Sequence, residues 1–286
     1  MKLETARLLI LGLCFVVSII VWLPLAHLFA QDTDGCFCLQ VSFLDVGQGD
    51  AIYIKSPEGF DALIDGGPDA SVLRTLAAAQ SWNDRHLDVV IATHTDADHV
   101  GGLVDVFQRY TIGAVLETTN QNDTSIAAAY DTASAETRTL VSEVPMHLHL
   151  GSSTRLTILS PAGDETNWES NTSSIVVLVE FGETRFLLTG DAPAGIENHL
   201  VAEFAPYLKS DVLKLGHHGS KTSSDTTFLA AVDPMYAVVS AGADNRYGHP
   251  HPEVIDRVEA VGATILETSK EGTITFYSDG ETVWRN

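Results

Sequence analysis

The sequence predicts an α/β domain in which strands and helices alternate, set behind an apolar N-terminal segment. Short apolar runs that end at glycine or at polar residues indicate buried strands, as in residues 87–92. Apolar residues at helical spacing follow several of these runs, as in residues 71–79. With 286 residues and a hydrophobic content of 45%, the chain can bury a core of the size that one such domain needs.

The first part of the chain carries a membrane signal. Residues 8–30 contain no Asp, Glu, Lys or Arg, and a helix needs about 20 apolar residues to cross a bilayer. Lys2 and Arg7 precede this span, whereas Asp32 and Asp34 follow it. The positive-inside rule therefore predicts a single-pass protein of the cell membrane whose folded body is extracytoplasmic.

A cleaved signal peptide, which would release a secreted protein, is the alternative. Leu28 disagrees with the small-x-small cleavage pattern, and the apolar run is longer than a usual signal core, so we favour an uncleaved anchor. The expected organisation is a cytoplasmic tail (1–7), a transmembrane anchor (8–30), a short linker (31–38) and one folded domain (39–286).

Strands and helices can be placed in order along the folded domain. Alternating or short apolar runs predict strands, and apolar residues three or four apart predict helices. The expected strands are residues 39–44, 51–55, 62–64, 87–92, 112–116, 144–150, 155–159, 174–181, 184–189, 211–215, 236–239 and 264–267, with a closing hairpin around Gly280. The expected helices are residues 71–79, 102–110, 226–231 and 252–261, and residues 120–137 are a soft helix or a surface excursion.

The most informative motif comes directly after strand 87–92. His94, Asp96, Asp98 and His99 follow one another closely, at a point where the strand ends and a helix is expected. Imidazole and carboxylate are groups with which proteins bind divalent metals. Four such side chains on one loop predict a metal site rather than a solvated turn.

Two further strands end in residues of the same kind. Strand 184–189 is followed by Gly190-Asp191, and strand 211–215 by Gly216-His217-His218-Gly219. In layered α/β folds the carboxyl ends of strands meet at one edge, where sites assemble. We therefore expect these side chains to join the metal site.

Taken together, these motifs resemble those of the metallo-β-lactamase-fold hydrolases. The resemblance rests on Asp65-Gly66-Gly67, His94-x-Asp96-x-Asp98-His99, Gly190-Asp191 and His217. Three motifs narrow it to the C-terminal hydrolase domain of ComEC-type competence (DNA-uptake) proteins: Phe43-Leu44-Asp45-Val46-Gly47-Gln48-Gly49-Asp50-Ala51, Leu215-Gly216-His217-His218-Gly219-Ser220 and Tyr247-Gly248-His249-Pro250. The resemblance implies a four-layer αββα metallo-β-lactamase sandwich, with a two-metal site at one edge, that hydrolyses phosphodiesters.

The resemblance also implies a role for each ligand candidate. His94 and Asp96 bind one metal ion, Asp98 and His99 bind the second, Asp191 bridges the two ions, and His217 completes the second site. A water held between the ions loses a proton near neutral pH and becomes the nucleophile as metal-bound hydroxide. Asp98 also orients that water, and Asp65 fixes the tautomer of a ligand histidine.

His249 and His218 are further candidates for catalysis. His249 would protonate the leaving oxygen or contact a phosphate, and the alternative is a structural role in its loop. His218 would contact the substrate or support a ligand.

The chain departs from the general family pattern at two places. Asp96 stands where most members have histidine, a change that the ComEC-type branch shares, and no histidine precedes strand 174–181. His147 and His149 do not replace it, because they alternate with apolar residues and are expected on a solvated strand face. We expect two divalent ions, zinc or manganese. The first site is oxygen-rich, which shifts its preference from zinc towards manganese or magnesium, or leaves it weakly filled.

The overall charge bears on the substrate. Lys and Arg number 16 and Asp and Glu 38, so the formal net charge is −22 at pH 7. This charge argues against broad adhesion to nucleic acid, although bound divalent ions would supply local positive charge.

The expected function is that of a membrane-anchored phosphodiesterase or nuclease acting on DNA during uptake or degradation. With one predicted span, the protein would need a separate DNA-uptake channel as its partner. Because fold does not fix substrate, hydrolysis of another ester is an alternative, for example a wall-polymer phosphodiester, a thioester or a lactam. A further alternative is a non-catalytic binding module that contains metal.

Overall fold

The computed structural model describes residues 36–81, 83–120, 122–163 and 165–285. The expected tail (1–7), the expected anchor (8–30) and most of the linker lie outside the described residues. Within the described part of the chain, no helix combines the length and the apolar character that crossing a bilayer requires. Cys38–Asn286 form one structural unit.

The first sheet contains eight strands. Its order is β15-β14-β1-β2-β3-β4-β5-β6, with antiparallel pairing from β15 to β3 and parallel pairing from β3 to β6. The strands are β1 (Leu39–Phe43), β2 (Ile52–Lys55), β3 (Asp61–Ile64), β4 (His86–Ile91), β5 (Thr111–Glu117), β6 (Thr139–Val141), β14 (Ile274–Ser278) and β15 (Val283–Arg285).

The second sheet contains seven strands. Its order is β13-β12-β11-β10-β9-β8-β7, with antiparallel pairing from β7 to β10 and parallel pairing from β10 to β13. The strands are β7 (Met146–Leu150), β8 (Thr154–Ser160), β9 (Val176–Phe181), β10 (Thr184–Leu188), β11 (Val212–Lys214), β12 (Tyr236–Val239) and β13 (Thr264–Glu267).

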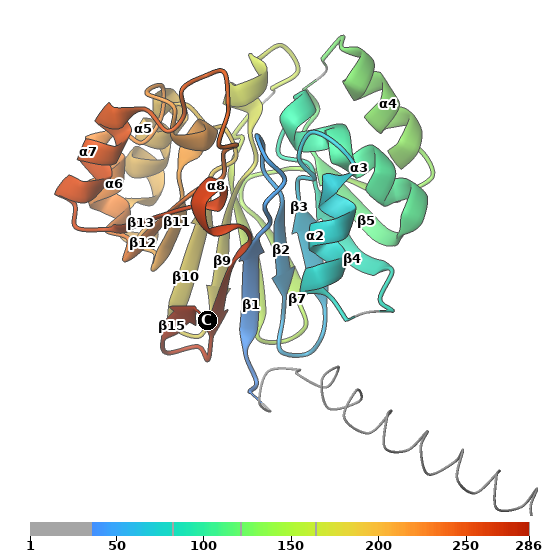
Figure 1. Ribbon diagram of the computed structural model, residues 1–286, viewed down its shortest axis with the longest axis horizontal. Helices are drawn as coiled ribbons and strands as arrows, with labels where there is room; N and C mark the ends of the chain where they lie inside the picture. The colour runs from blue at the N-terminus through green and yellow to red at the C-terminus, as the bar shows by residue number, and fades with distance from the viewer. Residues whose placement is uncertain (1–35, 82, 121, 164, 286) are drawn as a thin grey trace, which may run out of the picture. The chain divides into compact units, whose positions relative to one another are not determined.

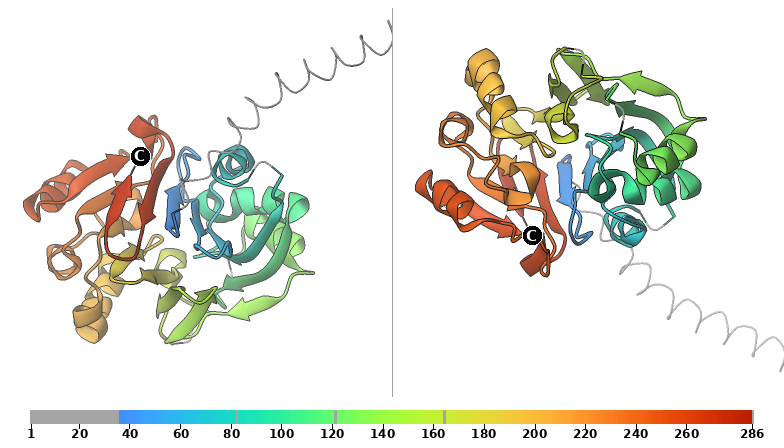
Figure 2. Two further views of the ribbon diagram at one scale, coloured as in Figure 1. Left: turned by 90° about the horizontal axis from the view of Figure 1, so that it is seen from below. Right: turned by 90° about the horizontal axis from the view of Figure 1, so that it is seen from above.

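Helices cover the outer face of each sheet, as Figures 1 and 2 show. Those on the first sheet are α2 (Ser71–Ala79), α3 (Ala97–Arg109) and α4 (Ser125–Ser134). Those on the second sheet are α5 (Ala194–Phe204), α6 (Thr226–Val232) and α7 (Pro252–Ala260). A short helix, α8 (Thr268–Glu271), follows β13.

Three buried apolar clusters separate these layers. One lies between the sheets and takes side chains from both, among them Phe43 of β1, Phe186 of β10 and Phe276 of β14. The Phe276 ring packs edge to face, with its centroid 6.0 Å from that of Phe43 and 6.2 Å from that of Phe186. The other two clusters lie between each sheet and its own helices. The expected four-layer αββα arrangement is therefore confirmed.

The parallel strands position the site. β3 and β4 run parallel in the first sheet, and β10 and β11 run parallel in the second. The loops that follow these four strands leave at the end of the molecule that lies away from the β14–β15 turn (Figure 1). Since side chains at the carboxyl ends of parallel strands share an edge, residues far apart in sequence can meet there.

Most elements lie within a few residues of their expected places, but α3, β6, α5 and the short α8 differ. α3 begins at Ala97 rather than at residue 102, so Asp98 lies in its first turn. β6 and α5 are elements that no sequence pattern predicts. α5 lacks a clear apolar stripe, because Ile196 and Leu200 are its only buried apolar residues and the buried Glu197 lies between them.

Candidate metal centre

The loop after β4 supplies the first histidines of the centre. β4 ends at Ile91, and α3 begins at Ala97, after a connection that carries His94. His99 follows in the first turn of α3, and both imidazoles are almost completely buried. Their ring centroids lie 4.1 Å apart. Two imidazoles therefore point into one buried space where the strand gives way to the helix.

The second sheet completes the constellation. Asp191 follows β10 and His218 follows β11, and both side chains are buried. The Asp191 carboxylate lies 3.3 Å from Nε2 of His99 and 3.4 Å from Nε2 of His218. Asp191 thus lies between a histidine of each sheet, which is the position that a bridging ligand needs.

Two overlapping groups of side chains could each hold an ion. His94, His99 and Asp191 form one group, and each offers a ligand atom within 4.8 Å of the others. Asp98, His99 and His218 form the second group under the same limit. Because Oδ2 of Asp98 lies only 3.3 Å from Nε2 of His218, the two groups adjoin.

The chemistry of these atoms fits a metal. Among the described residues, Nε2 of His94, His99 and His218 and Oδ1 of Asp191 are buried without a hydrogen-bond partner. Leaving a buried polar atom unpaired costs about 1–3 kcal/mol. An ion coordinated by these atoms would remove that cost, and imidazole with carboxylate suits zinc, iron or manganese.

Each of the three histidines is held through its other ring nitrogen. Nδ1 of His99 lies 2.7 Å from Asp65, Nδ1 of His94 lies 3.0 Å from the Thr93 hydroxyl, and Nδ1 of His218 lies 2.8 Å from the Ser240 carbonyl. Such contacts fix the ring orientation and leave Nε2 free to bind. All three Nε2 atoms therefore face the centre.

Asp65 has the position that its predicted orienting role requires. Besides His99, it accepts hydrogen bonds from the backbone N–H and the hydroxyl of Thr93, at 2.8 and 2.7 Å. Its φ of +58° lies in the left-handed region that non-glycine residues rarely adopt. This conformation after β3 turns the carboxylate towards the centre; the functional role itself stays a prediction.

The two histidines after β11 differ in burial, and the predicted ligand role of His217 stays a prediction. The side chain of His218 is 1% exposed, whereas that of His217 is 28% exposed. Nε2 of His217 lies 3.8 Å from Asp191, its Nδ1 contacts the Thr222 hydroxyl, and it belongs to neither ligand group. Both histidines have positive φ, at 48° and 55°, so the chain turns within the pair and brings the second ring inward.

Asp96 lies near the centre but outside the two ligand groups. Its Oδ2 is 3.8 Å from Nε2 of His94. Its Oδ1 accepts hydrogen bonds from Asn122 at 3.1 Å and from Ser170 at 2.7 Å. No histidine precedes β9, and the Ser174 hydroxyl lies 3.5 Å from Nδ1 of His94. Asp96 is therefore held beside His94 by hydrogen bonds, and the oxygen-rich character of the first site stays a prediction.

A buried ion pair beneath the centre is a feature that no sequence motif reveals. Lys214 of β11 and Asp50 of the β1–β2 loop are both buried and form an ion pair. The Lys214 ammonium also donates to the Gly190 carbonyl at 2.8 Å and lies 3.6 Å from Asp191. Asp50 lies 3.3 Å from Nδ1 of His218. The pair thus contacts both of the ligand candidates that the second sheet supplies.

Burial and neighbouring charges shift the pKa values of His94 and His218 in opposite directions. Burial, together with nearby His99, lowers the pKa of His94 to about 4, so this imidazole is neutral, as a metal ligand must be. Burial also acts to lower the pKa of His218, but Asp191 and Asp50 raise it to about 9. A proton therefore competes with a metal ion for His218.

His249 lies at the outer rim of the centre. Its ring centroid is 5.6 Å from that of His217 and 6.3 Å from that of His218. Burial and these two histidines lower the pKa of His249 to about 4. An imidazole that is neutral at neutral pH suits a hydrogen bond to substrate, and the predicted catalytic role stays a prediction.

His147 and His149 are exposed on β7, as expected.

Comparisons with known proteins agree with this geometry. A profile of the Metallo-beta-lactamase superfamily matches residues 44–243. The chain is 28% identical to ComE operon protein 3 of Bacillus subtilis, over 83% of this chain and 33% of that protein. It is 33% identical to Competence protein ComA of Neisseria gonorrhoeae, over 82% of this chain and 32% of that protein. The chain spans about a third of the length of these curated relatives.

A solved structure supports the fold. The metallo-beta-lactamase fold protein YhfI from Bacillus subtilis superposes with a TM-score of 0.53 and 14% sequence identity. The match covers 87% of this chain and 99% of that chain. At this level of identity, the likeness concerns the fold alone.

Proposed function

Because this chain belongs to the metallo-beta-lactamase superfamily, whose fold supports a metal-dependent hydrolase, we propose that it is a phosphodiesterase of the nuclease type that acts on DNA. The similarity to a competence protein over 82% of the chain supports DNA as the substrate.

The observation that carries the proposal is a set of four buried atoms that can coordinate a metal ion and that have no hydrogen-bond partner among the described residues. Nε2 of His94, His99 and His218 and Oδ1 of Asp191 come from both sheets and face one another. These side chains would hold a pair of divalent ions, and His218 would take the ligand role that the resemblance gives to His217. Such ions would supply Lewis acidity towards the phosphoryl oxygens and the attacking water.

Asp98 is the candidate for positioning that water. Its side chain is 31% exposed, so it is open to solvent while its Oδ2 lies 3.3 Å from His218. Burial acts to raise the pKa of Asp98, but the adjacent His218 and His99 hold this pKa below its usual range. An ionised carboxylate at the mouth of the centre can accept a proton from water and fix its direction of approach.

We also propose that residues 8–30 anchor the protein in the cell membrane with the hydrolase domain outside. The apolar run and the charges that flank it support this topology. A separate DNA-uptake channel would then be the partner. Protease treatment of intact cells tests the orientation: the folded domain should be degraded without lysis, whereas protection until lysis would place it in the cytoplasm.

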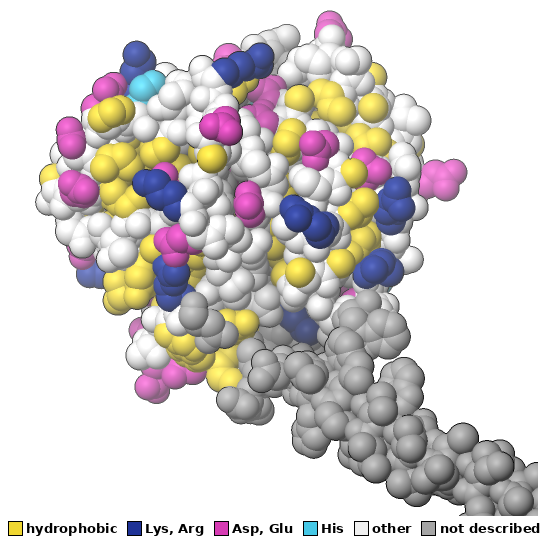
Figure 3. All heavy atoms as spheres, viewed as in Figure 1, with side chains coloured by type: hydrophobic (Ala, Val, Ile, Leu, Met, Phe, Trp, Pro, Cys, Tyr) yellow, Lys and Arg dark blue, Asp and Glu magenta, His cyan; other side chains and the backbone are white. Residues whose placement is uncertain are grey.

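A second candidate is the hydrolysis of another ester on the same fold. The net charge of −22 favours it, because an acidic surface repels a polyanion. On the face drawn in Figure 3, Lys and Arg side chains are scattered among Asp and Glu and form no continuous basic patch. The alternative substrates are a wall-polymer phosphodiester, a thioester or a lactam, and the charge argument favours the last two, which are not polyanions.

The deciding experiment uses the full chain purified in detergent. Hydrolysis of bis(p-nitrophenyl) phosphate and of single- and double-stranded DNA is measured with manganese, with zinc and with a chelator. Asp98→Ala should abolish metal-dependent cleavage of all three. Asp105→Ala is the matched control, since Asp105 lies on the same helix and pairs only loosely with Arg109, at 3.9 Å.

Each outcome leads to a different conclusion. Metal-dependent DNA cleavage that is lost in Asp98→Ala and kept in Asp105→Ala supports the nuclease. Cleavage of the small diester without DNA cleavage favours the second candidate. No turnover of any ester while metal is demonstrably bound would leave a non-catalytic binding module as the function.

A further inference from the structure

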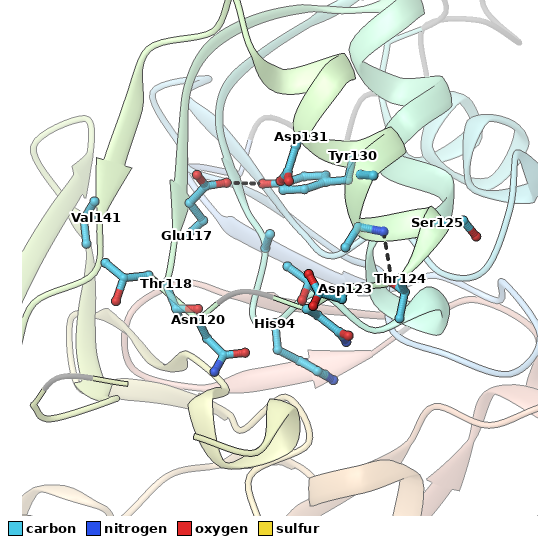
Figure 4. A pocket seen from close by; sticks show the side chains of 16 residues that line it. His94, Glu117, Thr118, Asn120, Asp123, Thr124, Ser125, Tyr130, Asp131 and Val141 are labelled. Carbon is cyan, nitrogen blue, oxygen red and sulfur yellow. Dashed lines mark hydrogen bonds between the residues drawn. The ribbon is translucent and has the colours of Figure 1, made fainter. Parts of the chain in front are cut away.

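A pocket of about 780 Å³ opens beside the metal centre. It lies against the ends of β4 and β5 and against α4, as Figure 4 shows. Ligand-binding pockets typically measure about 300–1,000 Å³. The pocket is therefore large enough to take an organic group attached to the reacting phosphodiester.

His94 connects the pocket with the metal centre. It lines the pocket, is 1% exposed, and its Nε2 has no hydrogen-bond partner among the described residues. Thr95, the next lining residue, also has a buried hydroxyl without a partner. Asn122 lines the same pocket and donates a hydrogen bond to Asp96 at 3.1 Å. A group bound here would consequently lie next to the site of hydrolysis.

The charge of the lining decides what can bind. Three carboxylates line the pocket, those of Glu117, Asp123 and Asp131, and none of its lining residues is Lys or Arg. Burial raises the pKa of Glu117 from its ordinary value, yet Asp123 and Asp131 are exposed. A phosphate group in this pocket would face negative charge, and no Lys or Arg among the lining residues would offset it. The lining therefore disfavours an anionic group.

The hydrogen-bonding groups of the lining point to a ligand that donates. The Asn120 amide is occupied, because it donates to the carbonyls of Glu165 and Trp168 at 2.8 and 2.9 Å. The Tyr130 hydroxyl donates to Glu117 at 2.6 Å, and Figure 4 shows these two side chains meeting at the pocket wall. Carboxylate oxygens remain as acceptors, and they match the hydroxyl and N–H groups of an uncharged ligand.

We propose that this pocket binds the uncharged nucleoside at one end of the nucleic-acid chain, beside the scissile phosphodiester. This inference rests on the proposed function. A nucleoside supplies sugar hydroxyls and base N–H donors and carries no charge of its own. A terminal phosphate on that nucleoside would enter the acidic pocket, so the enzyme would discriminate against strands that carry one.

The test measures kcat/KM for three forms of the dinucleotide thymidylyl-thymidine. The first has free hydroxyls at both ends, the second carries a phosphate at its 5′ end, and the third carries a phosphate at its 3′ end. The full chain in detergent is used with manganese. One of the two phosphorylated forms should have a kcat/KM lower by about tenfold or more, as expected for an uncompensated like-charge contact. A difference below about twofold for both forms would overturn the inference.

A charge-reversal variant links the effect to the pocket. Asp123→Lys places an ammonium group in the lining and should restore most of the lost kcat/KM for the phosphorylated dinucleotide. Glu203→Lys is the matched control, because Glu203 is an exposed residue of α5 that does not line the pocket. Equal effects of the two variants would attribute the change to net charge and refute the pocket.

Binding without catalysis separates this inference from the proposed function. Ligand-observed NMR on the chelator-treated full chain should detect thymidine, and should detect thymidine monophosphate only with Asp123→Lys. If this binding pattern were seen but no diester were cleaved, the nuclease proposal would be refuted and the proposal of a nucleoside pocket would stand. If the protein cleaved diesters but bound thymidine no better than thymidine monophosphate, the nuclease proposal would stand and the nucleoside-pocket proposal would be refuted.

Discussion

At the scale of single residues, the adjacent histidines after β11 determine how the metal centre is completed. Nδ1 of His218 is held by the Ser240 carbonyl and its Nε2 faces Asp98 and Asp191, whereas Nε2 of His217 stays 3.8 Å from Asp191. His218→Ala should weaken metal binding by more than the about 10–100-fold typical of an outer contact. His217→Ala should bind metal nearly as tightly as the unchanged protein.

Competition with a chromogenic chelator measures both affinities on equal terms. Each variant serves as the control for the other, because both remove one imidazole from the same turn. Loss of metal in His217→Ala with full binding in His218→Ala would reverse the assignment and restore the ligand set that the resemblance implies.

The sequence can predict the types of ligand but not every individual ligand. His94, Asp98, His99 and Asp191 follow buried strands, so position alone marks them as site residues. Nothing in Gly216-His217-His218-Gly219 shows which ring faces inward, because the direction depends on the left-handed backbone at both histidines. Such a conformation is imposed by the surrounding fold rather than by local preference.

At the scale of elements, the Lys214–Asp50 ion pair connects β11 with the β1–β2 loop. Both side chains are fully buried, and Asp50 and Asp191 raise the pKa of Lys214 although burial acts to lower it. Lys214→Met would remove the ammonium group that pairs with the buried Asp50 and should lower the free energy of unfolding by about 3–5 kcal/mol.

Urea unfolding of Lys214→Met and of Asp50→Asn/Lys214→Met together checks this expectation. The double variant removes both charges and should recover part of the lost stability. If the two variants were equally stable, the cost would come from lost packing of the lysine stem and not from the orphaned carboxylate.

α5 contributes a pH-sensitive contact with the start of α6. The buried carboxyl of Glu197 accepts hydrogen bonds from the backbone N–H groups of Ser224 and Asp225 at 2.6 and 2.8 Å. Burial raises its pKa from 4.5 to about 7. Because the folded state binds the proton more tightly than the unfolded state, this group's contribution to stability falls as pH rises from about 4.5 to about 7.

The matching measurement is urea unfolding at about pH 5 and about pH 8, for the unchanged protein and for Glu197→Gln. Titration of Glu197 should lower the free energy of unfolding by up to about 3 kcal/mol between these two pH values. The Glu197→Gln variant should not show this decrease. An identical pH dependence of the two proteins would show that Glu197 titrates normally.

The sequence predicts β10 and β11 more readily than α5, because the position of α5 depends on the surrounding fold. β10 and β11 are short apolar runs with turn residues at their ends, so their positions follow from composition. α5 has few buried apolar residues, and Glu197 interrupts them. Its position is decided by tertiary contacts with α6, which no local pattern contains.

At the scale of the whole molecule, net charge should govern the response to salt. The chain carries −22 while a DNA substrate is a polyanion. Proteins that bind DNA through basic surfaces lose affinity as salt rises, because counterions are released on binding. Here screening should weaken repulsion, so KM for DNA should fall as monovalent salt rises from about 50 mM to about 200 mM.

The control for this effect is bis(p-nitrophenyl) phosphate, a small diester with one charge, whose KM should change little over the same range. A steep rise in KM for DNA with salt would contradict the expectation. It would instead indicate a local basic groove that dominates over the net charge.

The two sheets share the metal centre, and this has a thermodynamic consequence for the domain. His94 and His99 belong to segments that follow β4, whereas Asp191 and His218 follow β10 and β11. Each of the two ligand groups takes side chains from both sheets, so an ion in either group is bound only while the two halves stay together. Its binding energy therefore adds to the energy needed to separate them. Free ion at about 1,000 times its Kd would add about 4 kcal/mol to the stability of the folded state. Metal supply would then set the lifetime of the folded protein, and starvation for the ion would remove the folded protein as well as its activity.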